Sequence, residues 1–276
     1  MSGPAGPSGR VLDLFAVPQE YRSIPGGRGR SVVAGDVVLS PGRDVTTARW
    51  LDPVLARLAV QLDSSERRSM RIAVPVPARD GSWVVDGWGA SRYEPDTTAC
   101  HDLSVLVGTG RLLHAHLRSV FSERPPVDSR TDRWALADRL AFSEPQLLRA
   151  AVDPLDARHD LLGDVARRLD LPAGEELATA PDQLVHGDLA GNVLLDARGV
   201  PVVIDLAPYW RPAVWAEAVC VLDAVLWLGA RPQALEEWTG GGRREAMLRA
   251  IAFRVLSDGP GCAVDRYANI LRLLPA

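Results

Sequence analysis

Lysine is absent from this 276-residue chain, so all 31 of its basic residues are arginine. A GC-rich genome disfavours lysine codons, and arginine replaces lysine readily on solvated surfaces. The exchange is not neutral where one particular cation must hold a phosphate, because the guanidinium group is a planar fork and the ammonium group a point charge. The absence therefore matters at any site that normally needs a lysine.

Cysteine is also scarce, and Cys100, Cys220 and Cys262 are widely spaced. No pair has the Cys-x-x-Cys spacing of a structural zinc site, and an odd, dispersed set suggests no disulfide framework. The five histidines do not cluster with the cysteines. These patterns favour neither a zinc protein nor a disulfide-stabilised secreted domain.

Long apolar runs and strong charge are missing as well. No apolar run reaches the roughly 18 residues that a membrane-spanning helix needs. The first residues lack the apolar segment of a secretory signal. The formal net charge of −4 does not favour nucleic acid or an anionic membrane. We expect a cytoplasmic protein that binds neither nucleic acid nor membrane, with its oligomeric state left open.

The composition changes along the chain in a way that predicts two lobes. Residues 1–10 are rich in Gly, Pro and Ser and are predicted to be disordered. Residues 11–92 contain short β-rich segments and one helix over 45–62. Residues 93–276 have mainly helical spacing of apolar side chains. The pattern predicts an α+β fold with a small β-rich N-lobe and a larger, mainly α-helical C-lobe.

Three short apolar strands are predicted in the middle of the larger lobe, at 183–185, 193–195 and 202–204. His186, Asp188 and Asn192 follow the first of these strands, and Asp205 follows the last. Side chains at the ends of buried strands are held by a rigid scaffold and yet stay accessible. We expect these polar groups to lie together in one local hairpin.

These residue types suit phosphoryl transfer. Asp188 can orient an attacking hydroxyl and accept its proton. Asn192 and Asp205 offer the hard oxygen ligands that Mg²⁺ prefers when phosphates supply the others. His186 is expected to brace the catalytic loop through hydrogen bonds. Two alternatives stay open: a buried turn whose polar groups satisfy the backbone, and a metal-dependent hydrolase with His186 and Asp188 as ligands.

The string HGDL at 186–189, a following Asn192 and an apolar strand that ends in Asp205 resemble the catalytic motif of the aminoglycoside phosphotransferase and choline kinase family. The resemblance implies a bilobal protein-kinase-like fold, ATP and Mg²⁺ as cofactors, and a small-molecule hydroxyl as acceptor. The segments 134–139 and 204–219 are similar to an uncharacterised branch found mainly in GC-rich bacteria, and that branch indicates no substrate.

The catalytic loop departs from the family pattern by one residue. Asn192 lies four residues after Asp188, where the family usually has five. We expect Gly191 to absorb the tighter turn, because glycine adopts conformations that other residues avoid.

The phosphate-binding residues depart further. The family has a lysine in the strand after its glycine loop, and Ser40 stands at that position. The helix that follows has no glutamate to pair with such a lysine, and its acidic residue is Asp52. The two absences are coherent, because without the lysine the glutamate has no charge to pair with. We expect Arg30 or Arg43 to reach the phosphates in place of the lysine.

Further residues are expected to support cofactor and acceptor. The cofactor-binding set is the glycine loop with the position that follows it: Gly26, Gly27, Gly29 and Ser40. An ordinary hairpin turn uses the same glycines, so that signal is weak. Asp223 lies in an apolar helix, and we expect its buried carboxylate to anchor the catalytic-loop backbone or His186. Tyr209, Trp210 and Arg211 either line the acceptor pocket or pack the core.

The sequence thus indicates an ATP- and Mg-dependent phosphotransferase that acts on a small-molecule hydroxyl. The alternative is a degenerate pseudokinase that binds nucleotide weakly or serves as a partner-binding module, because Ser40 replaces the lysine.

Overall fold

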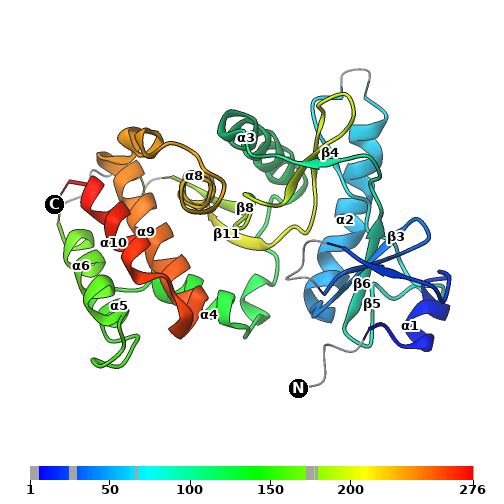
Figure 1. The fold of residues 1–276 in the computed structure, drawn as a ribbon, viewed down its shortest axis with the longest axis horizontal. Coiled ribbons are helices and arrows are strands. Elements are labelled where there is room, and N and C mark those ends of the chain that lie inside the picture. Colours follow the sequence, from blue (N-terminus) through cyan, green and yellow to red (C-terminus); the bar gives the residue numbers. More distant parts are fainter. Residues whose placement is uncertain (1–5, 25–29, 66–67, 172–176, 178–179, 276) are drawn as a thin grey trace. The chain divides into compact units, whose positions relative to one another are not determined.

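The computed structural model describes residues 6–24, 30–65, 68–171, 177 and 180–275. The chain forms two compact units, which Figure 1 shows as ribbons. The smaller unit comprises Met1–Ala99 and Val193–Asp205, and the larger unit comprises Cys100–Asn192 and Leu206–Ala276. The predicted boundary after residue 92 is therefore too early, and the segment 193–205 does not belong to the larger unit. Its strands join a sheet of the smaller unit, as described below.

A five-stranded antiparallel sheet lies in the smaller unit, in the order β1-β2-β3-β6-β5. Its strands are β1 (Arg22–Ser23), β2 (Val32–Ala34), β3 (Val37–Pro41), β5 (Val84–Val85) and β6 (Trp88–Arg92). Gly35 joins β2 to β3 with φ of +62°, in the left-handed region that glycine tolerates. Gly35 and Asp36 form the turn of this hairpin. Leu39 and Val32 bury their side chains in the core of this unit.

Two helices accompany this sheet. Helix α1 (Gly9–Leu14) is capped by Ser8, whose hydroxyl accepts from the amide of Val11, and Val11 is fully buried. The prediction of disorder through residue 10 is therefore wrong at its end. Helix α2 (Val45–Asp63) matches the predicted helix, begins at the Asp44 cap and accommodates Pro53 in its interior. It buries a continuous apolar stripe, which offsets the hydrogen bond that proline removes.

A second sheet of the smaller unit has the order β4-β10-β9-β7. Its strands are β4 (Arg71–Ile72), β7 (Thr98–Ala99), β9 (Val193–Leu195) and β10 (Pro201–Val203). Strands β9 and β10 form an antiparallel hairpin, and β10 pairs in parallel with β4. This pairing brings the segment 193–205 into the smaller unit, although the residues directly before it in the chain belong to the larger unit.

The larger unit is mainly helical. Its helices are α3 (Leu103–Val120), α4 (Arg133–Ala141), α5 (Pro145–Arg149), α6 (His159–Leu169), α8 (Ala213–Trp227), α9 (Gly241–Asp258) and α10 (Val264–Leu273). A two-stranded antiparallel sheet pairs β8 (Asp182–His186) with β11 (Pro208–Pro212). Trp215, Phe253 and Tyr267 are fully buried in the core of this unit. The α+β fold class is as the sequence predicts, with one β-rich and one mainly helical unit.

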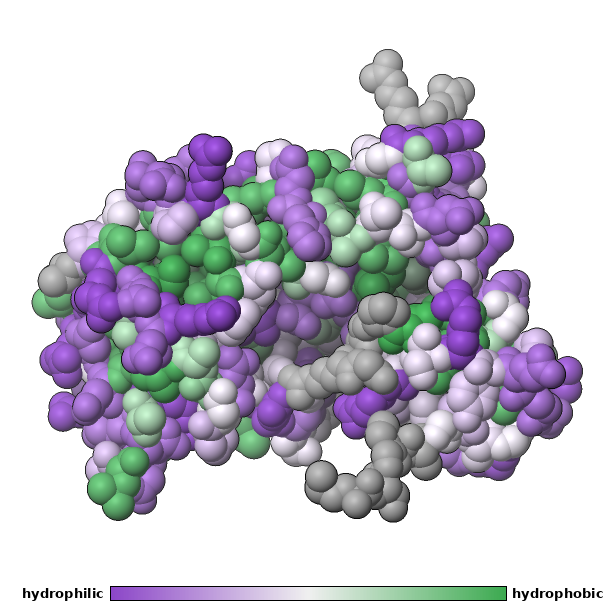
Figure 2. Space-filling model, viewed as in Figure 1, coloured by the Kyte–Doolittle hydropathy of each residue, from purple (hydrophilic) through white to green (hydrophobic). Residues whose placement is uncertain are grey.

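The surface mixes polar and apolar side chains. Figure 2 shows hydrophobic residues reaching the surface among hydrophilic ones on the face drawn. Within the described residues, no helix combines the length and the apolar character needed to cross a membrane.

Candidate active site

His186, the last residue of β8, braces the loop that follows it. Its side chain is fully buried, and its Nδ1 atom accepts from the amide of Asp188 at 3.1 Å and from the amide of Ala207 at 3.5 Å. A ring nitrogen that accepts carries no proton, so the imidazole supports the loop in its neutral form. Ala207 directly precedes β11, so His186 ties the loop to the neighbouring strand of the small sheet.

Helix α3 supports the same loop from a second direction through His114. The Nε2 atom of His114 accepts from the backbone amide of His186 at 3.1 Å, and the carbonyl of His114 accepts from Gln183 at 2.9 Å. Burial, with a smaller effect of His186, lowers the pKa of His114 to about 3. His114 is therefore neutral at physiological pH, which an acceptor in this place requires.

Two glycines shape the loop. A Cβ atom at Gly187 would lie 2.4 Å from the ring of Tyr209 and 3.2 Å from that of Trp215, so only glycine fits there. Gly191 has φ of +89°, and the amide of Asn192 donates to the carbonyl of Leu189 at 2.9 Å. Gly191 thus makes the tight turn that the shortened loop needs.

The Asp188 carboxylate is held at both oxygens. Its Oδ1 accepts from Nη2 of Arg254 at 2.6 Å, and its Oδ2 accepts from Nδ2 of Asn192 at 3.3 Å. The same Asn192 nitrogen donates to the backbone carbonyl of Asp188 at 2.6 Å. The Asp188 side chain is nevertheless 47% exposed. Because Asn192 donates through nitrogen, its amide oxygen stays available as a hard ligand atom.

Arg254 on α9 was not predicted from the sequence. Its Nε donates to Oδ1 of Asp223 on α8 at 2.9 Å, and its Nη2 contacts the other oxygen of Asp223. Burial raises the pKa of Asp223 to about 6, although Arg254 opposes the shift. Burial lowers the pKa of Arg254, and Asp223 and Asp188 more than offset this, so the net shift is upward. Both groups are thus charged at neutral pH.

The role expected for Asp223 changes accordingly. We expected its carboxylate to bond the loop backbone or His186, and it instead pairs with Arg254, which contacts Asp188. The sequence does contain a signal for Arg254. Arg254 stands between the apolar residues Phe253 and Val255, and Asp223 lies in another apolar helix, so each is a charged residue in apolar surroundings that needs a partner. Two such residues need each other.

Asp205 follows β10 in the smaller unit and has φ of +46°, a conformation that Asp tolerates better than most residues. Its side chain is 53% exposed, and its Oδ1 accepts from Nη1 of Arg43 at 2.9 Å. Asn192 directly precedes β9 and Asp205 follows β10, the two strands of one antiparallel hairpin, so the expectation of a shared hairpin is wrong only for Asp188. Strand β8, which leads to Asp188, pairs with β11, whereas β10 pairs with β9 and β4.

Arg43 also approaches the acidic residue of helix α2. Its Nη2 lies 3.5 Å from Oδ1 of Asp52, whose side chain is only 5% exposed. Burial raises the pKa of Asp52, and Arg43 opposes the shift. The helix has no glutamate, as the sequence shows, and its acidic residue Asp52 pairs instead with Arg43.

The path of the Arg43 side chain depends on two glycines. Gly42 has φ of +76°, which turns the chain after β3. A Cβ atom at Gly89 would lie 2.9 Å from Cγ of Arg43 and 3.3 Å from its Nε. Gly89 pairs with Ser40 in the register of β3 and β6. The Arg43 side chain therefore lies against β6 at the residue that pairs with Ser40.

The other predicted cofactor residues have different outcomes. The Oγ atoms of Ser40 and Ser31 lie 3.1 Å apart, so the Ser40 hydroxyl is engaged within the sheet. Gly26, Gly27 and Gly29 lie outside the described residues.

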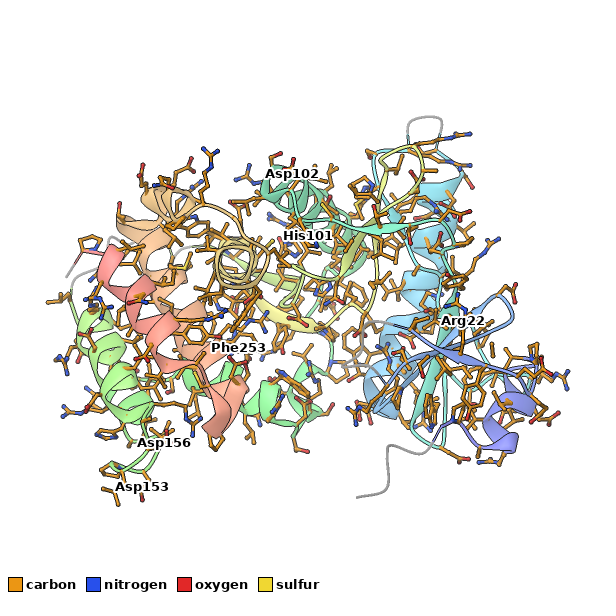
Figure 3. All side chains as sticks on the ribbon, viewed as in Figure 1. Arg22, His101, Asp102, Asp153, Asp156 and Phe253 are labelled. Atoms are coloured by element: carbon orange, nitrogen blue, oxygen red, sulfur yellow. The ribbon has the colours of Figure 1, made fainter. Side chains whose placement is uncertain are left out.

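The three residues considered for an acceptor pocket lie on β11. Tyr209 is 4% exposed and makes edge contacts with the rings of Trp215 and Phe253, which places it in the core. Phe253 is labelled in Figure 3 on α9. Arg211 forms two hydrogen bonds with Asp138, at 2.8 and 2.9 Å. Trp210 is half-buried. Core packing thus accounts for Tyr209, and the acceptor role is a proposal for Trp210.

A β-rich unit and a mainly helical unit of this kind match the kinase-like fold of small-molecule kinases. The chain is similar to aminoglycoside phosphotransferase APH(4)-Ia, with a TM-score of 0.56 and 15% identity over 97% of this chain and 98% of that chain. It is similar to APH(2")-IIa, solved as a ternary complex with streptomycin and ATP, with a TM-score of 0.51 and 14% identity over 96% and 95%.

An ethanolamine kinase of Plasmodium vivax has a TM-score of 0.50 and 11% identity, over 92% of this chain and 81% of that chain. At these identities the likeness establishes the fold alone. No protein-family model matches the chain, and no curated protein matches it in sequence.

Proposed function

We propose that this protein is a phosphotransferase that moves the γ-phosphoryl group of ATP, with Mg²⁺, to a hydroxyl of a small molecule. The observation that carries the proposal is the carboxylate of Asp188, which is half-exposed yet bonded at both oxygens by Arg254 and Asn192. A base for a hydroxyl needs this combination of access and fixed direction. The structure of APH(2")-IIa with ATP and streptomycin supports the same pairing of nucleotide and small-molecule acceptor.

Each unit offers a residue suited to magnesium. The amide oxygen of Asn192 and the exposed carboxylate of Asp205 are hard donors, as Mg²⁺ prefers. Among the described residues, no group of three or more His, Cys, Asp and Glu side chains is arranged to hold a metal ion. The amide oxygen of Asn192 and the carboxylate of Asp205 are each suited to Mg²⁺, because this ion commonly takes one or two protein ligands and keeps phosphates and water for the rest. When bound, Mg·ATP supplies the phosphoryl group and balances its charge.

Arg43 is the proposed cation for the nucleotide phosphates in place of a lysine at Ser40. Its guanidinium group contacts Asp52 and Asp205, in the manner of a lysine that pairs with a helix glutamate. Arginine recognises phosphate oxygens through two parallel hydrogen bonds, so it serves this role without an ammonium group.

The test is turnover of ATP with a panel of small hydroxyl compounds, followed by detection of the phosphorylated product. Asp188→Asn should lower kcat by about 10²–10⁴-fold with the fold intact, because proton transfer contributes that much to such reactions. Asp182→Asn is the matched control, since Asp182 opens the strand that Asp188 follows. Equal kcat for Asp188→Asn and wild type would refute the proposal.

A pseudokinase is the second candidate, favoured by the engagement of Ser40 with Ser31. Binding and catalysis separate the two functions. If Arg43 holds phosphates, Mg·ATP should raise the melting temperature, and EDTA should remove this rise. Arg43→Met should make the rise with Mg·ATP smaller. It should leave the rise caused by adenosine, which has no phosphates, unchanged. A melting temperature that does not respond to millimolar Mg·ATP would favour a partner-binding module.

A further inference from the structure

The pair between Arg254 and Asp223 lies behind the proposed catalytic residue. Arg254 contacts Asp223 side-on, with Nε on one carboxylate oxygen and Nη2 on the other. The same Nη2 atom donates to Asp188 at 2.6 Å. A guanidinium nitrogen of this type carries two hydrogens, so one nitrogen bonds both carboxylates at once.

Stability does not explain why the pair is there. Helices α8 and α9 are packed with apolar side chains, and Phe253 and Val255, which flank Arg254, are fully buried. Removing two charges from water costs several kilocalories per mole per ion, and apolar residues of similar volume often stabilise such a site equally well. The apolar alternative lacks one property: it cannot donate a hydrogen bond to Asp188.

The three side chains differ in their access to solvent. Arg254 and Asp223 are 9% and 6% exposed, whereas Asp188 is 47% exposed. The packing of α8 against α9 fixes the buried pair in position. Through the hydrogen bond from Arg254, the pair in turn fixes the solvent-exposed carboxylate of Asp188. Asn192 holds the second oxygen, so rotation of the carboxylate is blocked from both sides.

The charges balance in a way that suits a base. Asp223 neutralises Arg254, so the bond from Arg254 positions Asp188 without cancelling its negative charge. A lone arginine at this place would instead form a simple ion pair with Asp188. The two buried groups therefore work as one neutral donor.

We propose that Arg254, together with Asp223, is a positioning residue for phosphoryl transfer that fixes the Asp188 carboxylate through the shared Nη2 nitrogen. The inference rests on the proposed function of Asp188 as base. It assigns a role in the reaction to two helices that carry none of the catalytic motif.

The test is the double variant Asp223→Leu with Arg254→Met, which removes both charges and keeps apolar volume. Its kcat should fall about 10–100-fold, because a small misplacement of a reacting group has that effect, while KM for ATP changes little. The control is Glu245→Leu with Arg249→Met, another pair on α9, with a 2.8 Å contact that does not involve Asp188. The control pair should leave kcat unchanged.

Hydrogen exchange supplies a measurement that does not depend on turnover. The amides of Asp188 and Asn192 are bonded within the loop, and they should exchange faster in the double variant and at the wild-type rate in the control. Arg254→Lys is the second variant, in case the double variant fails to fold. Its ammonium group pairs with Asp223 as a point charge without the fork that serves both carboxylates, so kcat should also fall.

The outcomes separate this inference from the proposed function. Unchanged kcat in the double variant, with kcat lost in Asp188→Asn, overturns the positioning role and leaves the phosphotransferase intact. A change in KM or melting temperature with unchanged kcat shows a purely structural pair and also overturns it. Equal kcat for Asp188→Asn and wild type overturns the function of Asp188 and this inference together.

Discussion

The two units contain the same arrangement of charges in two different settings. In the larger unit Arg254 contacts Asp223, buried on helix α8, and Asp188, exposed after strand β8. In the smaller unit Arg43 contacts Asp52, buried on helix α2, and Asp205, exposed after strand β10. Each unit thus has one arginine between a buried helical carboxylate and an exposed one at a strand end.

The difference lies in how tightly each arginine is held. Arg254 is 9% exposed and contacts Asp188 at 2.6 Å. Arg43 is 26% exposed, contacts Asp205 at 2.9 Å and lies 3.5 Å from Asp52. A buried, short and shared contact holds a residue in one position, whereas an exposed and longer one leaves it able to exchange partners. This difference supports the proposal that the larger unit fixes Asp188 as a base and that the smaller unit keeps Arg43 as a cation for an anionic ligand.

Replacing each arginine by methionine should give the largest difference in stability between the two units. Arg254→Met leaves Asp223 buried without a cation and should lower the free energy of unfolding by about 3–5 kcal/mol. Arg43→Met should cost less, about 1–3 kcal/mol, because Arg43 is itself 26% exposed and lies 3.5 Å from Asp52, although this change too leaves a buried carboxylate without its cation. Urea unfolding of both variants measures the contrast. A similar loss in the two variants would mean that burial does not distinguish the two arginines.

Acid should act in opposite directions on His114 in the larger unit and on Asp52 in the smaller unit. The pKa of His114 is lowered to about 3 by burial, so its stabilising contribution is complete above the unfolded value of 6.5 and is lost as the pH falls. Between about pH 7 and about pH 4.5 the expected loss is roughly 2–3 kcal/mol. Burial raises the pKa of Asp52, so acid favours the folded form there.

The variant His114→Gln tests the first effect. Glutamine keeps an acceptor for the amide of His186 and does not titrate. Urea unfolding at a series of pH values should show a weaker loss of stability in acid for this variant than for wild type. If the two pH profiles coincide, His114 is not the source of the acid sensitivity.

Replacing one glycine near each charge arrangement by alanine, Gly187 in the larger unit and Gly89 in the smaller unit, should give the smallest difference in stability between the two units. A Cβ at Gly187 meets the rings of Tyr209 and Trp215, which cannot move in a packed core, so Gly187→Ala should cost about 1–3 kcal/mol or more. A Cβ at Gly89 meets the flexible side chain of Arg43. Gly89→Ala should therefore cost less than about 1 kcal/mol and mainly weaken the response to Mg·ATP. Melting temperatures with and without Mg·ATP measure both effects.

Local features followed from the sequence because neighbouring residues determine them. Helix α2 and strands β8, β9 and β10 correspond to predicted segments, and Gly35 makes a left-handed turn between β2 and β3. Their signals are apolar residues at helical spacing, short apolar runs and glycine in a left-handed turn, which act over a few residues. The residue types for phosphoryl transfer, Asp188, Asn192 and Asp205, also stand out in the sequence alone.

Long-range partners did not follow from the sequence. Arg254 lies 66 residues from Asp188, and Arg43 lies 162 residues from Asp205. Whether such side chains meet depends on which strands pair and how helices are packed, and not on any local preference. The pairing of β10 with β4 is one such decision, and it places the segment 193–205 in the smaller unit.

The sequence by itself therefore determined the kinds of chemical groups in this protein and the elements that carry them. Only the tertiary structure decided which carboxylate each arginine contacts, because a charge pair forms between distant residues where packing brings them together and excludes water. Ser40 illustrates both contributions: the sequence shows a serine where the family that it resembles has a lysine, and the fold brings Arg43 to Asp52 and Asp205.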